Sequence, residues 1–155
     1  MKTMPGEPLY QATVEKEWID SLGHVNFLEY QRIADLASER LWLEVGGPPI
    51  ASASLTYVIA QTHVHYLREL RLGDPVSVET QLIGYDARRM HLYHSVRRRE
   101  ELVSIVQFLG LAFDLSRRRA SQWSASMLEG LAARTRSADG EPLKGLVDWG
   151  LSRPA

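Results

Sequence analysis

One long segment with the periodicity of a helix constrains the fold more than any other feature of this sequence. Between Phe27 and Val45, apolar side chains recur every three or four residues, which places them along one side of an α-helix. Leu36 and Trp42 widen this stripe, so we expect the helix to be buried on more than one side. Two glycines followed by two prolines, at positions 46–49, end it. The stripe consists of Phe27, Tyr30, Ile33, Ala34, Ala37, Leu41 and Val45.

Five segments with the alternating pattern of β-strands accompany this helix. Apolar and polar residues exchange places along most of each segment, as expected of a strand that turns one face to a core. The last segment carries apolar residues on both faces, so we place it centrally in the sheet. A strand, a long helix and four further strands predict an α+β fold with an antiparallel five-stranded sheet wrapped around the helix. The predicted strands are Leu9–Trp18, Leu55–Tyr66, Val76–Tyr85, Met90–Arg98 and Leu102–Asp114.

The second face of the predicted sheet also needs a cover, because the one long helix covers only one face. Self-association is the usual way to supply it. Residues 136–155 are rich in glycine, proline and charge, but they also carry several large apolar side chains, too many for a disordered tail. We expect this tail to dock on the domain formed by residues 1–135 or on a neighbouring subunit. A short helix is predicted just before it, over Ser126–Arg134, since Glu129 follows Ser126 at the spacing of a capping box.

Length and composition restrict the classes of function. A chain of 155 residues suits one domain with a real core, and a net charge of −1 gives no global attraction to nucleic acid or to an anionic membrane. The sequence has no cysteine, which excludes disulfides, thiolate metal sites and a cysteine nucleophile. It shows neither a signal peptide nor an apolar run of membrane-spanning length. These features fit a cytoplasmic protein.

The turn before the long helix carries the residues that could take part in a reaction. Asn26 is a good N-cap, and Glu29 stands where a capping box would return a hydrogen bond to the Asn26 amide. The N–H groups of Phe27 and Leu28 then lack partners within the helix, and the helix dipole makes this end attractive to negative charge. A carboxylate, Asp20, precedes this end by one glycine-containing turn. A carboxylate beside an oxyanion-binding helix end provides the groups needed for acyl transfer. The alternative is that Asp20 and Asn26 only cap the helix.

This turn also resembles a known family. The pattern Asp20-x-x-Gly23-His24-x-Asn26, with Tyr30 one turn into the helix, resembles the opening motif of the hotdog-fold acyl-CoA thioesterases of the 4-hydroxybenzoyl-CoA thioesterase type. The resemblance implies that Asp20 attacks the thioester carbonyl or activates a water to do so. It also implies that a helix-end amide holds the oxyanion.

The resemblance extends over much of the chain, from about residue 9 to residue 118. A Gly73-Asp74 pair opens a later strand, as in that family. Two runs, Thr62–Val76 and Tyr85–His94, resemble more narrowly the thioesterases of carnitine breakdown, which act on betainyl-CoA. Two positions depart from the family pattern: Trp18 replaces a second acid, and Phe27 replaces a second asparagine. Both departures make the preferred acyl group harder to predict, but neither removes the proposed chemistry.

The family resemblance predicts the wider site and its partners. It implies a homodimer or a dimer of dimers whose active sites lie at subunit interfaces. It implies an acyl-CoA substrate, no metal and no cofactor apart from the coenzyme A of that substrate. Nucleic acid and membranes are not expected partners. The predicted catalytic groups are Asp20, the Phe27 backbone N–H and His24; the predicted substrate contacts are Gly23, Asn26, Tyr30, Thr62 and His63; Arg88 and Arg89 are predicted to bind the phosphates of coenzyme A.

Several of these residues have a simpler interpretation. His24 either orients Asp20, donates to the substrate or bonds only to the backbone of its turn. Gly23 serves the turn, and Thr62 is an ordinary β-branched strand residue. Arg88 and Arg89 equally suit a solvated strand start, and the basic run Arg117–Arg119 is a further candidate for phosphate binding. An aromatic cage for a cationic acyl group could draw on Trp18, Tyr57 and Tyr66.

Three rival functions use the same sequence differently. A non-catalytic acyl-CoA-binding module of this fold would act as a sensor. A hotdog dehydratase would need another Asp/His pairing, which we do not find. A metal-binding domain would use His63 and His65, which share one face of a strand, with His24 as a third zinc ligand.

Overall fold

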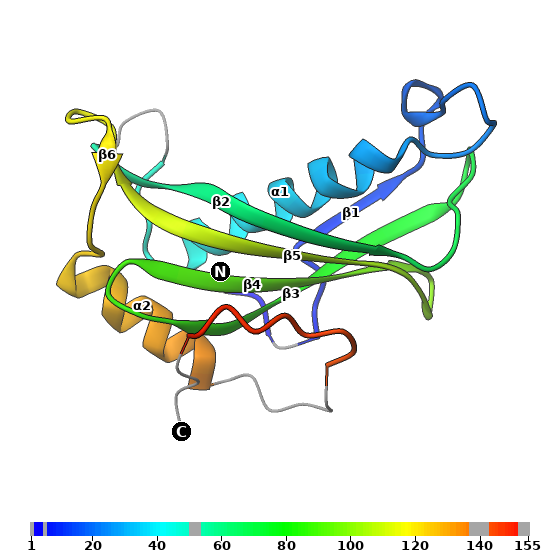
Figure 1. Ribbon diagram of the computed structural model, residues 1–155. Helices are drawn as coiled ribbons and strands as arrows, with labels where there is room; N and C mark the ends of the chain where they lie inside the picture. The colour runs from blue at the N-terminus through cyan, green and yellow to red at the C-terminus, as the bar shows by residue number, and fades with distance from the viewer. Residues whose placement is uncertain (1, 5, 50–53, 137–142, 152–155) are drawn as a thin grey trace.

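The computed structural model describes residues 2–4, 6–49, 54–136 and 143–151. It contains one curved antiparallel sheet in which the strands follow the order β1-β3-β4-β5-β2, with the short β6 paired to β5 (Figure 1). The long helix α1 lies along one face of this sheet, and the shorter α2 packs near β3. The elements are β1 (Tyr10–Thr13), a 3-10 turn (Lys16–Trp18), α1 (Phe27–Glu44), β2 (Leu55–Tyr66), β3 (Pro75–Tyr85), β4 (Arg89–Arg98), β5 (Glu101–Asp114), β6 (Arg119–Ala120) and α2 (Ala125–Arg136).

The periodic pattern of α1 forms the core as predicted. The buried residues of the helix are spaced three or four apart and face the sheet. Trp42 extends this core between two further rings, with ring centroids 5.1 Å from Tyr57 and 5.9 Å from Trp123. Gly47 is required beside it, because a Cβ atom there would lie 2.2 Å from the indole of Trp42. The buried residues of α1 are Tyr30, Ile33, Ala34, Ala37, Ser38, Leu41 and Trp42.

Two predicted elements were wrong at their ends. The first strand was predicted to run to Trp18 but ends at Thr13, because the chain turns into the 3-10 turn that buries the Trp18 indole. The helix α2 begins at Ala125, and the hydroxyl of Ser124 accepts the Met127 N–H (3.2 Å). The predicted cap at Ser126 is therefore displaced by two residues. The other predicted strands and the long helix are confirmed within one residue at each end.

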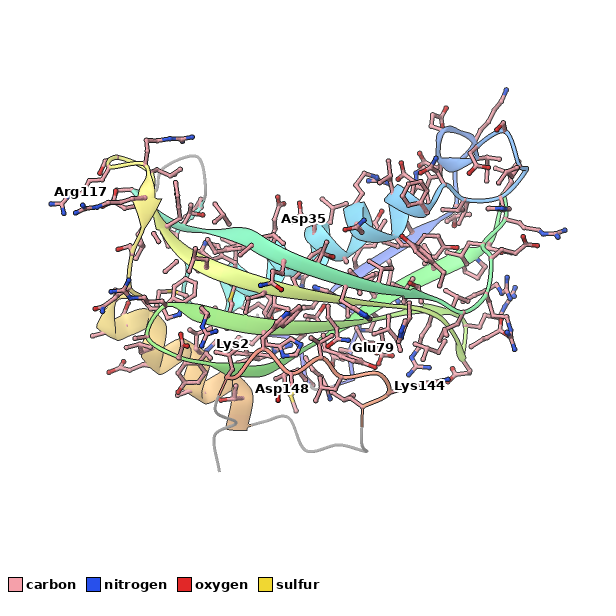
Figure 2. The ribbon with its side chains drawn as sticks, in the orientation of Figure 1. Lys2, Asp35, Glu79, Arg117, Lys144 and Asp148 are labelled. Carbon is pink, nitrogen blue, oxygen red and sulfur yellow. The ribbon has the colours of Figure 1, made fainter. Side chains whose placement is uncertain are left out.

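The described part of the tail lies on the second face of the sheet. Strand pairing places Tyr93 of β4 opposite Gln107 of β5, and both side chains point away from α1. Residues 143–151, which we call the strap, cross this outer face (Figures 1 and 2). The Tyr93 hydroxyl donates to the Lys144 carbonyl (2.6 Å), and the buried Gln107 side chain donates to Gly145 O and accepts from Val147 N–H. The described part of the tail therefore contacts the sheet of its own chain.

Trp149 holds the far end of the strap. Its indole N–H donates to Gln61 (3.0 Å), and its ring packs edge-on against His91 with centroids 4.6 Å apart. The Trp149 carbonyl accepts a hydrogen bond from Arg89 (3.1 Å). The strap therefore supplies hydrogen-bond partners to polar side chains on the outer face of the sheet, which would otherwise lack a partner within the chain.

Candidate active site

The loop before α1 is folded by its own backbone. A β-bridge joins Ile19 to Val25, and the Asn26 N–H donates to the Trp18 carbonyl (2.8 Å). Gly23 has φ +83°, a conformation that favours glycine, so it permits the tight reversal between the two sides of the bridge. The reversal brings Asp20 to the side of the helix end.

The Asp20 carboxylate has one engaged oxygen and one open oxygen. Its Oδ1 accepts the Leu22 N–H at 2.8 Å, which fixes the orientation of the carboxylate. Its Oδ2 has no hydrogen-bond partner among the described residues, and Asp20 lines a cleft. The open oxygen can therefore reach a ligand without breaking a contact within the chain.

The first turn of α1 presents a similar open group. The Asn26 side chain accepts the Leu28 N–H (2.9 Å), as expected of an N-cap. This contact leaves the N–H of Phe27 without a partner in the part of the chain that the structure describes. The predicted capping box is wrong, because Glu29 pairs with Arg32 instead. Of the two amides expected to be open at this end, Leu28 is taken by the cap and Phe27 remains.

The cleft beside these groups has a volume of about 370 Å³. It lies at the end of the sheet where α1 begins and β2 ends, to the right in Figure 1. Its walls come from the Asp20 loop, the first turn of α1 and the connection that follows β2. The lining residues are Asp20, Leu22, His24, Val25, Phe27, Tyr30, Tyr66, Leu67, Arg68 and Glu69.

Two tyrosines form the inner wall of this cleft. The rings of Tyr30 and Tyr66 meet edge to face with centroids 5.3 Å apart. The Tyr30 hydroxyl accepts the Leu70 N–H (3.1 Å), and the Tyr66 hydroxyl donates to the Phe27 carbonyl (2.9 Å). Burial raises the pKa of both phenols, so both remain protonated near neutral pH. Their hydroxyls bind the backbone, and the rings are left to contact a ligand.

His24 lines the cleft but does not orient Asp20 through its ring. Its Nδ1 lies 3.1 Å from the Val25 carbonyl, so this nitrogen carries the proton and donates. Only the two backbones are joined, through the Asp20 N–H and the His24 carbonyl (3.0 Å). Of the roles predicted for His24, this contact is the bond to the backbone of its turn, and a direct contact with a ligand in the cleft stays a prediction.

The structure does not bring Thr62 and His63 to the cleft of the same chain. The Thr62 hydroxyl donates to Gln31 of α1 (3.1 Å), midway along β2. His63 points to the other face of the sheet, where its ring meets that of His65 with centroids 4.9 Å apart. His24 lines the cleft and not that face, and no group of three or more His, Asp or Glu side chains among the described residues is arranged to hold a metal ion.

The two predicted phosphate-binding arginines lie near the turn between β3 and β4, at the opposite end of the sheet from Asp20. Arg89 is occupied there, because it donates to Asp86 (2.8 Å) and to the Trp149 carbonyl. The exposed Arg88 side chain has no partner among the described residues. Arg88 is therefore the more available of the two cations.

The aromatic residues proposed for a cage are also divided. The guanidinium of Arg32 lies over the ring of Trp18, 4.9 Å from its centroid, and Tyr57 packs on Trp42 in the core. Only Tyr66 reaches the cleft, where Phe27 and Tyr30 accompany it.

Sequence reasoning missed the wall formed by Leu67, Arg68 and Glu69. These residues have no motif of their own. They reach the cleft because Tyr30 holds the Leu70 N–H and because the Val25 N–H donates to the Leu70 carbonyl (2.8 Å). Such long-range contacts leave no local pattern in a single sequence.

The curved antiparallel sheet with one long helix along its face is the hotdog fold. A family model described as the thioesterase-like superfamily matches residues 14–131. The chain belongs to this superfamily.

Two relatives and one solved structure show how close the similarity is. The chain is 26% identical over 125 residues to an L-carnitine dehydrogenase/betainyl-CoA thioesterase of Agrobacterium fabrum, a match covering 79% of this chain and 26% of that protein. It is 28% identical over 89 residues to a betainyl-CoA thioesterase of Pseudomonas aeruginosa, covering 56% of each. The fold is also similar to that of SAV2348 from Staphylococcus aureus, whose structure was solved in complex with CoA. This match has a TM-score of 0.82 at 21% identity and covers 99% of this chain and 100% of SAV2348. The matches thus span about a quarter and about half of the two relatives, and the solved structure supports the fold.

None of the described helices has the length and apolar character that crossing a bilayer would require.

Proposed function

We propose that this protein is an acyl-CoA thioesterase that hydrolyses a CoA thioester to a free acid and CoA. One observation carries the proposal: an open carboxylate oxygen on Asp20 and an open N–H on Phe27 belong to residues that line the same cleft. Hydrolysis of a thioester requires a base or nucleophile near the carbonyl carbon and a donor for the negative charge that develops on its oxygen. The names of the two relatives and the CoA bound to SAV2348 support the same chemistry.

Two routes use this geometry. In the first, Asp20 Oδ2 attacks the carbonyl carbon and CoA leaves as its thiolate, which takes a proton from water. A second water then hydrolyses the anhydride, which releases the free acid and restores the Asp20 carboxylate. In the second, Asp20 accepts a proton from a water whose oxygen attacks the carbonyl, and the collapse of the tetrahedral intermediate expels CoA. In both routes the oxyanion accepts a hydrogen bond from the Phe27 N–H, at the positive end of the α1 dipole.

The aromatic residues in the walls of the cleft bear on the charge of the acyl group. The aromatic faces of Phe27, Tyr30 and Tyr66 and the carboxylate of Asp20 would together suit a cationic acyl group such as betainyl. The second carboxylate of the cleft, Glu69, is already paired with Arg71. Kinetics with betainyl-CoA and with neutral acyl-CoAs of similar size separate the two classes, and faster hydrolysis of the neutral series would contradict the cationic preference.

A second copy of the chain would complete the site. β2 is an edge strand that pairs with β5 on one side and with no other described strand on the other side. A two-fold antiparallel pairing of β2 with itself, centred between Ala60 and Gln61, would place Leu55 of one copy opposite Tyr66 of the other. The cleft of one copy would then face the opposite sheet end of its partner.

That opposite end is the basic end of the sheet. It carries the exposed Arg88, whose carbonyl accepts the Ala112 N–H, and the turn between β5 and β6, which contains Arg117 (Figure 2). Coenzyme A could therefore place its thioester at Asp20 of one copy and its phosphates near Arg88 of the other. In this arrangement the predicted homodimer would be needed for catalysis, since neither copy alone holds both ends of the substrate.

A hydrolysis screen over acyl-CoAs of different size and charge, following thiol release, tests the proposal. We expect turnover by the wild-type chain and loss of turnover in Asp20→Asn. The rival sensor function predicts another outcome: saturable acyl-CoA binding without turnover, and binding retained in Asp20→Asn. The sensor would then replace the enzyme as the function of this cleft.

A further inference from the structure

We propose that Tyr66 is a positioning residue that holds the Phe27 N–H in place for the oxyanion. The inference rests on the proposed thioesterase function and adds to it a residue outside the motif before α1. Tyr66 lines the cleft with its ring and bonds the backbone of Phe27 with its hydroxyl.

The Phe27 N–H needs external support because of its place in the helix. Phe27 is the first residue of α1, so its N–H has no acceptor four residues earlier that could fix its direction. The Phe27 side chain is 57% exposed and is not anchored in the core. The adjacent cap bonds the N–H of Leu28 rather than that of Phe27. The Asn26 carbonyl, in the same peptide plane as this N–H, accepts the Glu29 N–H (2.9 Å), so the N–H is oriented with the end of the helix. Its position relative to Asp20 therefore depends on how that end of α1 is held against the sheet.

Tyr66 supplies the missing support from the sheet. Its hydroxyl donates to the Phe27 carbonyl (2.9 Å), and its ring meets the Phe27 ring edge to face at 6.5 Å. Tyr66 is itself fixed, because it is the last residue of β2, lies opposite Ser104 of β5 and packs against the buried Tyr30. A residue anchored in the sheet therefore connects the sheet to the first residue of the helix.

This support matters for rate more than for binding. A donor preorganised toward the developing oxyanion stabilises the transition state, whereas a donor that must be reoriented loses that advantage. The thioester in the ground state carries less charge on its oxygen, so its binding depends less on the exact direction of this N–H. Loss of the Tyr66 hydroxyl should lower kcat and leave KM nearly unchanged.

The variant Tyr66→Phe removes the hydroxyl and keeps the ring. We expect kcat to fall about fivefold to tenfold, as for the loss of one neutral hydrogen bond, with KM changed by less than about twofold. Tyr93→Phe is the matched control, because it also removes a hydroxyl-to-carbonyl hydrogen bond, to Lys144 on the outer face. Tyr93→Phe should leave kcat unchanged.

A second pair of variants separates positioning from a general structural role. Phe27→Pro removes the N–H, and proline suits this site because it is favoured at the first helical position. Asn26 before it already has φ −58° and ψ 139°, which a following proline requires. Phe27→Ala removes the same ring but retains the N–H. If Tyr66 acts by positioning the N–H, Tyr66→Phe should lower kcat in the Phe27→Ala background and have no further effect in the Phe27→Pro background.

Each outcome decides the proposal. Equal losses in the Phe27→Ala and Phe27→Pro backgrounds, an unchanged kcat in Tyr66→Phe, or a loss confined to KM would overturn the positioning role while leaving the thioesterase intact. Absence of thioester hydrolysis by the wild-type chain across the whole acyl-CoA panel would overturn both the function and this role. Thermal unfolding of each variant identifies a loss of kcat that comes from misfolding, and such a loss would also count against positioning.

Discussion

Ser38 Oγ lies 3.0 Å from His94 Nε2 in the interior between α1 and the sheet. The Ser38 hydroxyl already donates to the Ala34 carbonyl, so the Nε2 of His94 is the donor in this pair. The Nδ1 then accepts from the Thr80 hydroxyl at 2.8 Å. Every polar atom of the group is satisfied when His94 is neutral. A second proton on the ring would point at a hydroxyl that is itself donating.

This arrangement predicts a stability that falls in acid. Burial, with a contribution from nearby His91, lowers the pKa of His94 from 6.5 to about 3. Between these two pH values the unfolded chain binds a proton that the folded chain does not, so the stabilisation is complete above about pH 6.5 and is lost as the pH falls toward 3. The expected slope is about 1.4 kcal/mol per pH unit.

Urea unfolding at pH 7.5, 6.0 and 5.0 measures this slope. His94→Gln, which cannot take up the proton, should be less stable at pH 7.5 but should lose less stability on acidification. The other titrating groups are common to both chains and cancel in the comparison. Parallel stability curves for the two chains would show that His94 does not carry the effect.

The open oxygen of Asp20 predicts a severe loss of catalysis with an intact fold. In Asp20→Asn the side-chain oxygen can still accept the Leu22 N–H, but the group can no longer act as nucleophile or base. We expect kcat to fall about 10²–10⁴-fold, with little change in thermal stability.

Asp148→Asn provides a closely matched control for this variant. Asp148 also accepts a backbone N–H two residues later, from Gly150 (2.8 Å), but it lies on the strap and not in the cleft. Its activity should equal that of the wild-type chain. If both variants lost activity to the same degree, the assignment of Asp20 would fail.

The sequence predicted most of the fold because the relevant signals are local. The stripe from Phe27 to Val45 defined α1, and alternation defined β2 to β5. The errors arose where tertiary contacts decided the outcome. Trp18 continues the pattern of a strand, yet burial of its indole draws the chain into a 3-10 turn, and the cap of α2 moved from Ser126 to Ser124.

Only the part of the candidate site that residues 20–30 form was predictable from the sequence. Asp20, His24, Phe27 and Tyr30 are close in sequence, and the turn and helix bring them to one cleft. The opposite wall, residues 67–69, depends on contacts between segments about 40 residues apart, such as Tyr30 with Leu70. The open or occupied state of a donor also depends on such contacts, which is why Arg88 and Arg89 could not be told apart from their sequence alone.

The different surroundings of these two arginines predict different effects of their removal. Arg88→Ala removes an exposed cation with no partner among the described residues and should raise the KM for acyl-CoA severalfold without changing kcat or stability. Arg89→Ala removes contacts to Asp86 and to the strap and should lower thermal stability. Steady-state kinetics and thermal unfolding of both variants test this division. A KM effect confined to Arg89→Ala would reverse the assignment.

The strap should be held to the sheet largely by Trp149, and its release should be visible at Lys144. Trp149→Ala removes the indole hydrogen bond to Gln61 and the ring contact with His91. Losing about 1.4 kcal/mol of such contacts would make the open strap about tenfold more populated. Trypsin cleaves after Lys144, and cleavage tracks the open population when opening is fast. We therefore expect cleavage at Lys144, followed by mass spectrometry, to accelerate about tenfold in Trp149→Ala.

Asp148→Asn should leave the rate of cleavage at Lys144 unchanged, because the lost charge lies on the exposed side of the strap. Equal cleavage rates in Trp149→Ala and the wild-type chain would mean that Tyr93 and Gln107 hold the strap without the tryptophan.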